Sequence, residues 1–245
     1  MKPYDAGRDK TEQVREMFDN IAPAYDVLNR AMSLGQDGRW RRRAVKTVAA
    51  ASPGYIIDIA TGTGDFAISL AKAIPGARVR GLDLSEGMIE IGRRKLAAAG
   101  LDDRVELLAG DCLDSPFPAG EADAVTAAFG VRNFADLQAG YRAFYDMLRP
   151  GGLVCVIELS TPASPLVKPF YNLYTRGIIP LMGRLVSHDR SAYSYLPASI
   201  AAVPRGRDML ALMEKAGFTD THCRTLTLGV CSIYTAIKPL HTDKK

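Results

Sequence analysis

One segment constrains the fold of this chain more than any other, the run Ile57-Asp58-Ile59-Ala60-Thr61-Gly62-Thr63-Gly64-Asp65-Phe66. A short apolar run leads into a glycine-rich turn, and a helical pattern begins directly after it. The glycines let the backbone turn sharply and let a ligand approach it without a Cβ in the way. Open α/β sheets bind ligands at the carboxyl ends of their strands. The segment therefore predicts a ligand site at the end of the first strand of an α/β sheet.

Short apolar runs alternate with amphipathic helical patterns along most of the chain. This alternation indicates a doubly wound α/β domain, in which helices cover both faces of a mostly parallel sheet. A last helix at about 209–216 precedes two further strands at 221–227 and 230–237, so seven strands are expected, with antiparallel pairing at the C-terminal end. The five earlier runs span residues 55–60, 78–83, 105–109, 122–128 and 153–159.

Two segments lie outside this alternation. Residues 1–50 are expected to form an N-terminal helical lid, because Val14, Met17 and Ile21 share one helical face, which Thr11 would cap and Pro23 would end. Residues 161–207 are rich in proline and aromatic side chains. They are expected to form a cap inserted into the main domain, which spans residues 51–245.

Composition and charge exclude several classes of protein. The net charge of +4 argues for neither a nucleic-acid nor a membrane partner. The four cysteines form no Cys-x-x-Cys pair, so we expect reduced thiols and no metal site. The first residues lack the apolar core of a secretory signal, and no apolar run approaches the roughly 20 residues of a membrane span. We expect a cytoplasmic protein, whose contact with a membrane, if it has one, is peripheral and at the inner face.

Two cofactors compete for the glycine-rich turn. Gly62-x-Gly64-x-x-Ala67, with Asp83 further on, also fits the dinucleotide fingerprint. A dinucleotide places its pyrophosphate on the helix N-terminus, where Asp65 would repel it. S-adenosylmethionine instead carries an ammonium and a sulfonium, which nearby carboxylates attract.

Acidic residues recur at three consecutive strand ends. Asp58 lies in the first strand, Asp83 ends the second, and Asp111-Cys112 follows the third. Asp83 can accept hydrogen bonds from both ribose hydroxyls, and a side chain after the third strand can bind the adenine edge. Each carboxylate also has a structural interpretation, as a helix cap or a turn residue. Their order along the sheet favours S-adenosylmethionine.

Further motifs run from about residue 11 to residue 238. They are Met17-Phe18-Asp19-Asn20-Ile21-Ala22, Tyr25-Asp26-x-x-Asn29, Ser33-Leu34-Gly35 with Trp40-Arg41, Phe129-Gly130-Val131-Arg132-Asn133, Leu148-Arg149-Pro150-Gly151-Gly152 and Tyr195-Leu196-Pro197-x-Ser199-Ile200. Through these motifs the chain resembles the ubiquinone/menaquinone biosynthesis C-methyltransferases. Within that family it is most similar to the menaquinone branch, the demethylmenaquinone methyltransferases.

The resemblance implies a class I S-adenosylmethionine-dependent methyltransferase fold, Rossmann-like, with an antiparallel C-terminal strand. It places Thr61, Asp83 and Asp111-Cys112 at the family's cofactor positions, beside Gly62 and Gly64 of the turn. Some members carry a serine where this chain has Ala128, so that side-chain contact is absent here. The implied acceptor is demethylmenaquinol, and the alternative is the polyprenyl methoxybenzoquinol of the ubiquinone branch or, further off, another small molecule or lipid.

Methylation of a ring carbon needs electron density on that carbon. A quinol supplies it through its phenolic oxygens, more so when a phenolic proton is removed, whereas a quinone withdraws it. The enzyme must align the reactants, exclude water and assist proton removal. These demands call for a donor beside the phenolic oxygen and a group that handles its proton.

Arg132 and Asn133 follow the fourth strand and are the candidate acceptor residues. Arg132 can stabilise a phenolate and Asn133 can hydrogen-bond a ring oxygen. Their structural alternatives are a pair between Arg132 and a surface carboxylate, and Asn133 as the cap of the next helix. Tyr25 of the lid and, in the cap, His188 are further catalytic candidates. Tyr193 and Tyr195 of the cap complete the set of side chains considered for proton handling.

The cap crowds apolar side chains between basic ones, and several interpretations fit it. Such a face can line a tunnel for a polyprenyl tail or lie on an anionic membrane. It can also pack as core or form a homodimer interface.

Nucleic acid is not expected as a partner. The basic stretch 39–43 is compatible with a nucleic-acid partner, but we interpret it as the solvated face of a helix. Enzymes that methylate base amines usually carry Asn/Asp-Pro-Pro-Tyr after the fourth strand, where this chain has Ala128-Phe129-Gly130. A binding module without catalysis would not need the glycine-rich turn, and the turn is intact.

Overall fold

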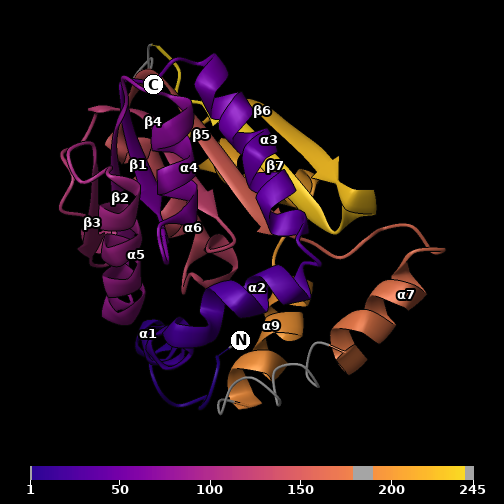
Figure 1. Ribbon diagram of the computed structural model, residues 1–245. Coiled ribbons are helices and arrows are strands. Elements are labelled where there is room, and N and C mark those ends of the chain that lie inside the picture. Colours follow the sequence, from indigo (N-terminus) through magenta and orange to yellow (C-terminus); the bar gives the residue numbers. More distant parts are fainter. Residues whose placement is uncertain (1, 179–189, 241–245) are drawn as a thin grey trace.

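The computed structural model describes residues 2–178 and 190–240, and within them a seven-stranded sheet dominates (Figure 1). Its strand order is β3-β2-β1-β4-β5-β7-β6. Strand β7 is antiparallel to both of its neighbours, β5 and β6, and the other pairs of described strands are parallel. This topology confirms the predicted fold class. The strands are β1 (Tyr55–Ile59), β2 (Arg78–Asp83), β3 (Val105–Ala109), β4 (Ala122–Ala128), β5 (Leu148–Leu159), β6 (Thr219–Leu226) and β7 (Cys231–Ile237).

Helices cover both faces of the sheet, because the central strands are apolar on both sides. Helices α3, α4 and α5 pack on one face, and α6 and α10 pack on the other. The helices are α1 (Lys10–Ile21), α2 (Tyr25–Met32), α3 (Gln36–Ala50), α4 (Asp65–Ala73), α5 (Glu86–Ala99), α6 (Leu137–Met147), α7 (Lys168–Leu173), α9 (Arg190–Ala202) and α10 (Arg207–Lys215). Shorter turns are η1 (Ala22–Ala24), η2 (Cys112–Asp114), η3 (Val131–Asn133), η4 (Tyr174–Ile178, a π-helix) and η5 (Thr227–Gly229).

Strand β5 begins five residues earlier than the apolar run predicts. Leu148 pairs with Ala122, and the register then shifts before Leu153 pairs with Ala124. Gly151 has a φ of +77°, and a Cβ on Gly152 would lie 2.8 Å from the Leu148 side chain. The Leu148-to-Gly152 motif is therefore an irregularity within the strand. Its glycines are typical of a loop, so the sequence pattern did not indicate a strand there.

The N-terminal helices lie across the carboxyl ends of the strands (Figure 1). The cap of α1 is Asp9, whose side chain accepts a hydrogen bond from Glu12 N at 3.0 Å, so the prediction of Thr11 as the cap was wrong. The cap lies two residues earlier than expected, and the helix begins at Lys10. A small core joins α1, α2, α5 and α9, and consists of Met17, Ile21, Ala22, Leu28, Met88 and Tyr195.

The chain leaves the sheet after β5 and returns to it at α10. In between, α7 extends away from the sheet, and α9 lies beside α2 at the ends of the strands (Figure 1). Within residues 2–178 and 190–240, no helix has the length and apolar character that crossing a membrane requires.

Candidate active site

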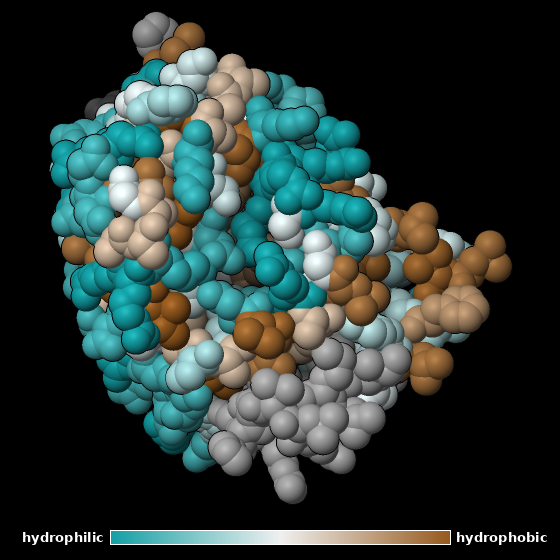
Figure 2. Space-filling view, viewed as in Figure 1, coloured by the Kyte–Doolittle hydropathy of each residue, from teal (hydrophilic) through white to brown (hydrophobic). Residues whose placement is uncertain are grey.

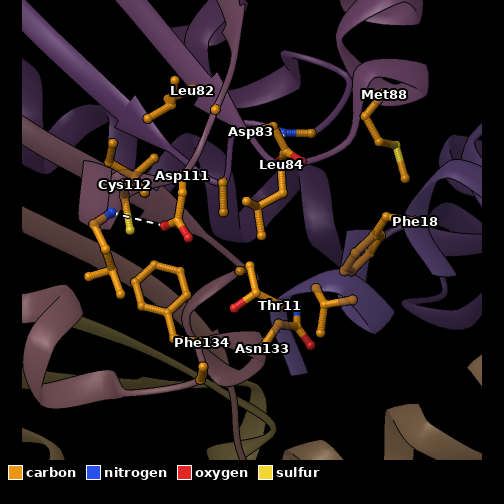
Figure 3. A pocket seen from close by; sticks show the side chains of 18 of the residues that line it. Thr11, Phe18, Leu82, Asp83, Leu84, Met88, Asp111, Cys112, Asn133 and Phe134 are labelled. Atoms are coloured by element: carbon orange, nitrogen blue, oxygen red, sulfur yellow. Dashed lines mark hydrogen bonds between the residues drawn. The ribbon is translucent and has the colours of Figure 1, made fainter. Parts of the chain in front are cut away.

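A cleft lies between helix α1 and the carboxyl ends of the first four strands (Figure 3). Asp83 and Leu84 border it from β2, Asp111 and Cys112 from the loop after β3, and Phe18 from α1. Among the described residues that line the cleft, three are aspartates and none is lysine, arginine or histidine. The cleft therefore suits a ligand with positive charge and disfavours a pyrophosphate.

The glycine-rich turn forms one wall of this cleft. Ala60, Gly62 and Gly64 have φ values of +52°, +56° and +77°. Left-handed backbone at three alternate positions explains the glycines in two of them. The turn exposes Gly62 to the cleft, whereas Thr61 and Gly64 are not among its described lining residues.

Asp83 is tied to the turn through its carboxylate. Oδ2 accepts a hydrogen bond from Gly62 N at 2.8 Å, and Oδ1 accepts one from Ser85 N at 3.0 Å. Burial raises the pKa of Asp83, while these backbone donors lower it. Each carboxylate oxygen can accept a second hydrogen bond, which fits the pair of ribose hydroxyls.

Asp58 lies beneath the turn and not in the cleft. It is fully buried and accepts hydrogen bonds from Thr61 Oγ1 and Thr126 Oγ1, each at 2.6 Å. Burial raises its pKa to about 6. Asp58 and Thr61 were both predicted as cofactor contacts, but their side chains bond to one another and support the turn from below.

Asp65 is paired and does not offer its charge to the cleft. Its carboxylate contacts Lys95 and, at 3.2 Å, Arg41. Lys95 Nζ also contacts Asp26 Oδ2 of α2 at 2.9 Å and Thr63 Oγ1 at 3.1 Å. The interpretation of Asp65 as an attractive charge for the ligand is therefore replaced by a structural one, in which this cluster fastens α2 to the turn.

Asp111 and Cys112 both line the cleft. Asp111 Oδ1 accepts a hydrogen bond from Leu113 N at 2.9 Å and so caps η2, the contact drawn as a dashed line in Figure 3. Its turn role and its place in the cleft thus coexist. Burial raises the pKa of Cys112 to about 12, so the thiol is neutral at physiological pH.

A second space, the outer cavity, lies between α2–α3 and α7–η4 at the ends of β4 and β5. Its lining is mostly apolar and aromatic, with Arg132 and the ion-paired Asp37 and Arg41 among the polar residues. A smaller inner cavity shares Tyr25 and Asn133 with the cleft and Arg132 with the outer cavity. These three side chains therefore stand where the spaces meet.

Arg132 is buried, with 7% of its side chain exposed. Its Nη1 contacts Glu158 Oε1 at 2.9 Å and also donates to Phe129 O. Its partner Glu158 is 1% exposed, so the alternative of a pair with a surface carboxylate was wrong. The Nε atom of Arg132 is buried without a hydrogen-bond partner among the described residues.

Asn133 does not cap the following helix. Asp136 does so by accepting a hydrogen bond from Ala139 N at 3.0 Å, which overturns that alternative. The Oδ1 atom of Asn133 is buried and has no partner in the described part of the chain. The junction of the cavities thus holds a buried donor, Arg132 Nε, and a buried acceptor, Asn133 Oδ1, without partners among the described residues.

Tyrosines surround the Arg132 guanidinium. Burial raises the pKa of Tyr25, Tyr171 and Tyr195, and the charge of Arg132 lowers each pKa in part. His188 and the side chain of Tyr193 lie outside the described residues. Glu158 is the residue that our sequence reasoning missed, although an acid at the end of a buried apolar run was a visible signal.

The described lining fits S-adenosylmethionine as the group held in the cleft. The three carboxylates match an ammonium and a sulfonium, Asp83 matches the ribose hydroxyls, and the apolar surfaces of Met88 and Phe134 can cover an adenine. A dinucleotide would bring its pyrophosphate to a cleft in which no described lining residue is cationic.

Comparison with known proteins agrees with this geometry. The model of the ubiE/COQ5 methyltransferase family matches residues 7–238. A demethylmenaquinone methyltransferase of Bacteroides fragilis is 44% identical over 97% of both chains. A ubiquinone/menaquinone biosynthesis C-methyltransferase of Geotalea daltonii is 42% identical over 94% of this chain and 98% of its own. The apo crystal structure of the S-adenosylmethionine-dependent methyltransferase SibL is similar with a TM-score of 0.57 and 25% identity, over 76% of this chain and 51% of that one.

Proposed function

We propose that this chain, which belongs to the ubiE/COQ5 methyltransferase family, transfers a methyl group from S-adenosylmethionine to a ring carbon of demethylmenaquinol, giving menaquinol. The observation that carries the proposal is the junction of an acidic cleft with an apolar cavity, marked by a free donor on Arg132 and a free acceptor on Asn133. One side of this junction suits the methyl donor and the other suits an apolar aromatic acceptor.

The cleft residues hold the donor. When bound, S-adenosylmethionine supplies an electrophilic methyl group on a sulfonium. Asp83 would accept hydrogen bonds from the ribose hydroxyls, and Asp111 with Cys112 would border the adenine. Gly62 contributes backbone without a Cβ at the wall of the cleft.

The junction residues act on the acceptor. Asn133 Oδ1 can accept a phenolic O–H, and Arg132 Nε can donate to a ring oxygen as that oxygen becomes anionic. Loss of the phenolic proton to water raises electron density on the neighbouring ring carbon, which becomes the nucleophile. After that carbon gains the methyl group, it loses its own ring proton to water, and the ring is aromatic again. A quinone has no O–H to donate to Asn133, so the free acceptor favours the quinol over the quinone.

The N-terminal segment 1–50 serves as a lid over the cleft, and the described parts of residues 161–207 serve as a cap over the acceptor. The lid is held by Asp26 and by Asp19, whose Oδ1 accepts a hydrogen bond from Ser85 Oγ at 2.6 Å. The apolar outer cavity would take the polyprenyl tail. Binding of a tailed and a tailless quinol, compared for the wild type and for a Val167→Ser variant of that cavity, tests this assignment.

Exposed apolar side chains surround the outer cavity and support peripheral contact with a membrane. They include Leu34, Leu166, Phe170, Leu173 and Leu228, with the exposed Lys168 among them. Figure 2 shows apolar side chains gathered over α7, which carries Phe170 and Leu173. An apolar patch that includes an exposed lysine fits an anionic lipid surface. Sedimentation with anionic vesicles should carry the protein down, whereas a homodimer that buries this patch would elute as a dimer and leave vesicles unbound.

The acceptor class is tested by labelled methyl transfer to two reduced substrates. Demethylmenaquinol should be methylated faster than polyprenyl methoxybenzoquinol. The benzoquinol is the second candidate because relatives such as that of Geotalea daltonii carry both pathways in their names. A faster rate with the benzoquinol would assign the chain to that substrate instead.

A further inference from the structure

Glu158 is a buried carboxylate at the end of the apolar run 153–157 in β5. The residues before it, Val156 and Ile157, are fully buried, and Glu158 itself is 1% exposed. Moving a carboxylate out of water is costly unless other groups compensate for it. Its position at the carboxyl end of β5 places it beside η3, which follows the neighbouring strand β4.

Glu158 holds Arg132 at two points. Oε2 accepts a hydrogen bond from Arg132 N at 3.0 Å, and Oε1 accepts one from Arg132 Nη1 at 2.9 Å. A third hydrogen bond, from Leu159 N to Oε1 at 2.8 Å, fixes the carboxylate itself. Because both the backbone and the guanidinium of Arg132 are held, its side chain has little freedom to turn.

We propose that Glu158 is a positioning residue that acts through Arg132. It holds one edge of the guanidinium, with help from Phe129 O, and leaves Nε free to donate to the acceptor oxygen. The pair has no net charge, so the cavity admits an uncharged quinol, and the directed N–H becomes most favourable only as negative charge develops. The inference rests on the proposed function, since that reaction creates the charge.

The Glu158→Gln variant removes the carboxylate and keeps its size. We expect kcat to fall about 10- to 100-fold, as for a misplaced catalytic group, with affinity for S-adenosylmethionine within twofold of the wild type. Asp123→Asn is the matched control. Asp123 also accepts two backbone N–H groups and pairs with an arginine, but it lies at the opposite end of the sheet. That variant should lose stability and keep kcat.

A double-mutant cycle with Arg132→Ala separates positioning from a general loss of structure. Because Glu158 acts through Arg132, Glu158→Gln should change kcat less than twofold in the Arg132→Ala background. Equal losses in both backgrounds, or an unchanged kcat in the folded single variant, would overturn the proposal. If Glu158→Gln does not fold, Glu158→Asp, which keeps the charge and is shorter, should lower kcat about tenfold by the same misplacement, and a wild-type kcat would overturn it.

A readout that needs no substrate distinguishes this inference from the proposed function. In protein labelled with 15N-arginine, the Arg132 side-chain NMR signals are identified by their loss in Arg132→Ala. We expect separate Nη signals in the wild type, because the held guanidinium does not rotate, and averaged signals in Glu158→Gln. Averaged signals in the wild type would contradict the positioning role of Glu158. Failure of the wild type to methylate any quinol would instead contradict the proposed function.

Discussion

Thr63 Oγ1 donates a hydrogen bond to Asp26 Oδ1 at 2.7 Å and so joins the glycine-rich turn to helix α2. Lys95 contacts both residues from α5. Asp26→Ala should therefore loosen the lid and weaken affinity for S-adenosylmethionine about tenfold, with faster release. Calorimetry and stopped-flow binding measure both quantities. Glu16→Ala, which breaks the exposed pair with Arg8, is the control and should change neither.

Asp83→Ala should weaken cofactor binding most strongly. Hydrogen bonds to a charged group contribute roughly 1.5–3 kcal/mol each, and the carboxylate is expected to accept two from ribose. We expect at least a hundredfold loss of affinity in a calorimetric titration. The exposed Asp102→Ala controls for the loss of one negative charge. Affinity within twofold of the wild type in a folded Asp83→Ala protein would remove Asp83 from the cofactor site.

Gly130→Ala should disturb the contact between the ends of β1 and β4. A Cβ at this position would lie 2.3 Å from the Cβ of Ala60, closer than atoms can approach. We expect a loss of stability of about 1–3 kcal/mol, together with weaker cofactor binding. Gly76→Ala is the matched control, because its added Cβ meets no atom within 4 Å. Denaturant unfolding of both variants decides the matter, and equal stabilities would contradict the close contact.

Asp58→Asn should change the pH dependence of stability. The folded-state pKa of about 6 lies above the ordinary aspartate value of 3.8, so the proton on Asp58 stabilises the fold at low pH. That contribution is lost as pH rises through the folded pKa. The variant lacks it and should gain about 1 kcal/mol relative to the wild type between pH 5 and pH 8. A difference that does not change with pH would show that Asp58 ionises normally.

The sequence predicted the sheet well, because buried parallel strands are continuous apolar runs. The bounds of β2, β3 and β4 agree with those runs. The start of β5 was missed, since Gly151 and Gly152 lie inside the strand. Glycine spacing and acidic positions also predicted the cleft, and Gly62, Asp83, Asp111 and Cys112 line it.

The direction of individual side chains was less predictable. Asp58 and Asp65 have the spacing of ligand contacts, but one points beneath the turn and the other pairs with Lys95. Asp58 meets Thr126 as its register partner on β4, and Asp65 meets Lys95 of another helix, so both pairings depend on how distant segments are placed. Glu158 was missed for the same reason, because its partner Arg132 belongs to a different strand end.

The central claim is that the ring carbon of a quinol accepts the methyl group. The direct measurement is transfer of labelled methyl from S-adenosylmethionine to demethylmenaquinone under anaerobic conditions, with and without chemical reductant. We predict transfer only with reductant, because the quinol alone supplies electron density to the ring carbon and an O–H to Asn133 Oδ1. Equal rates on the fully oxidised quinone would contradict the account.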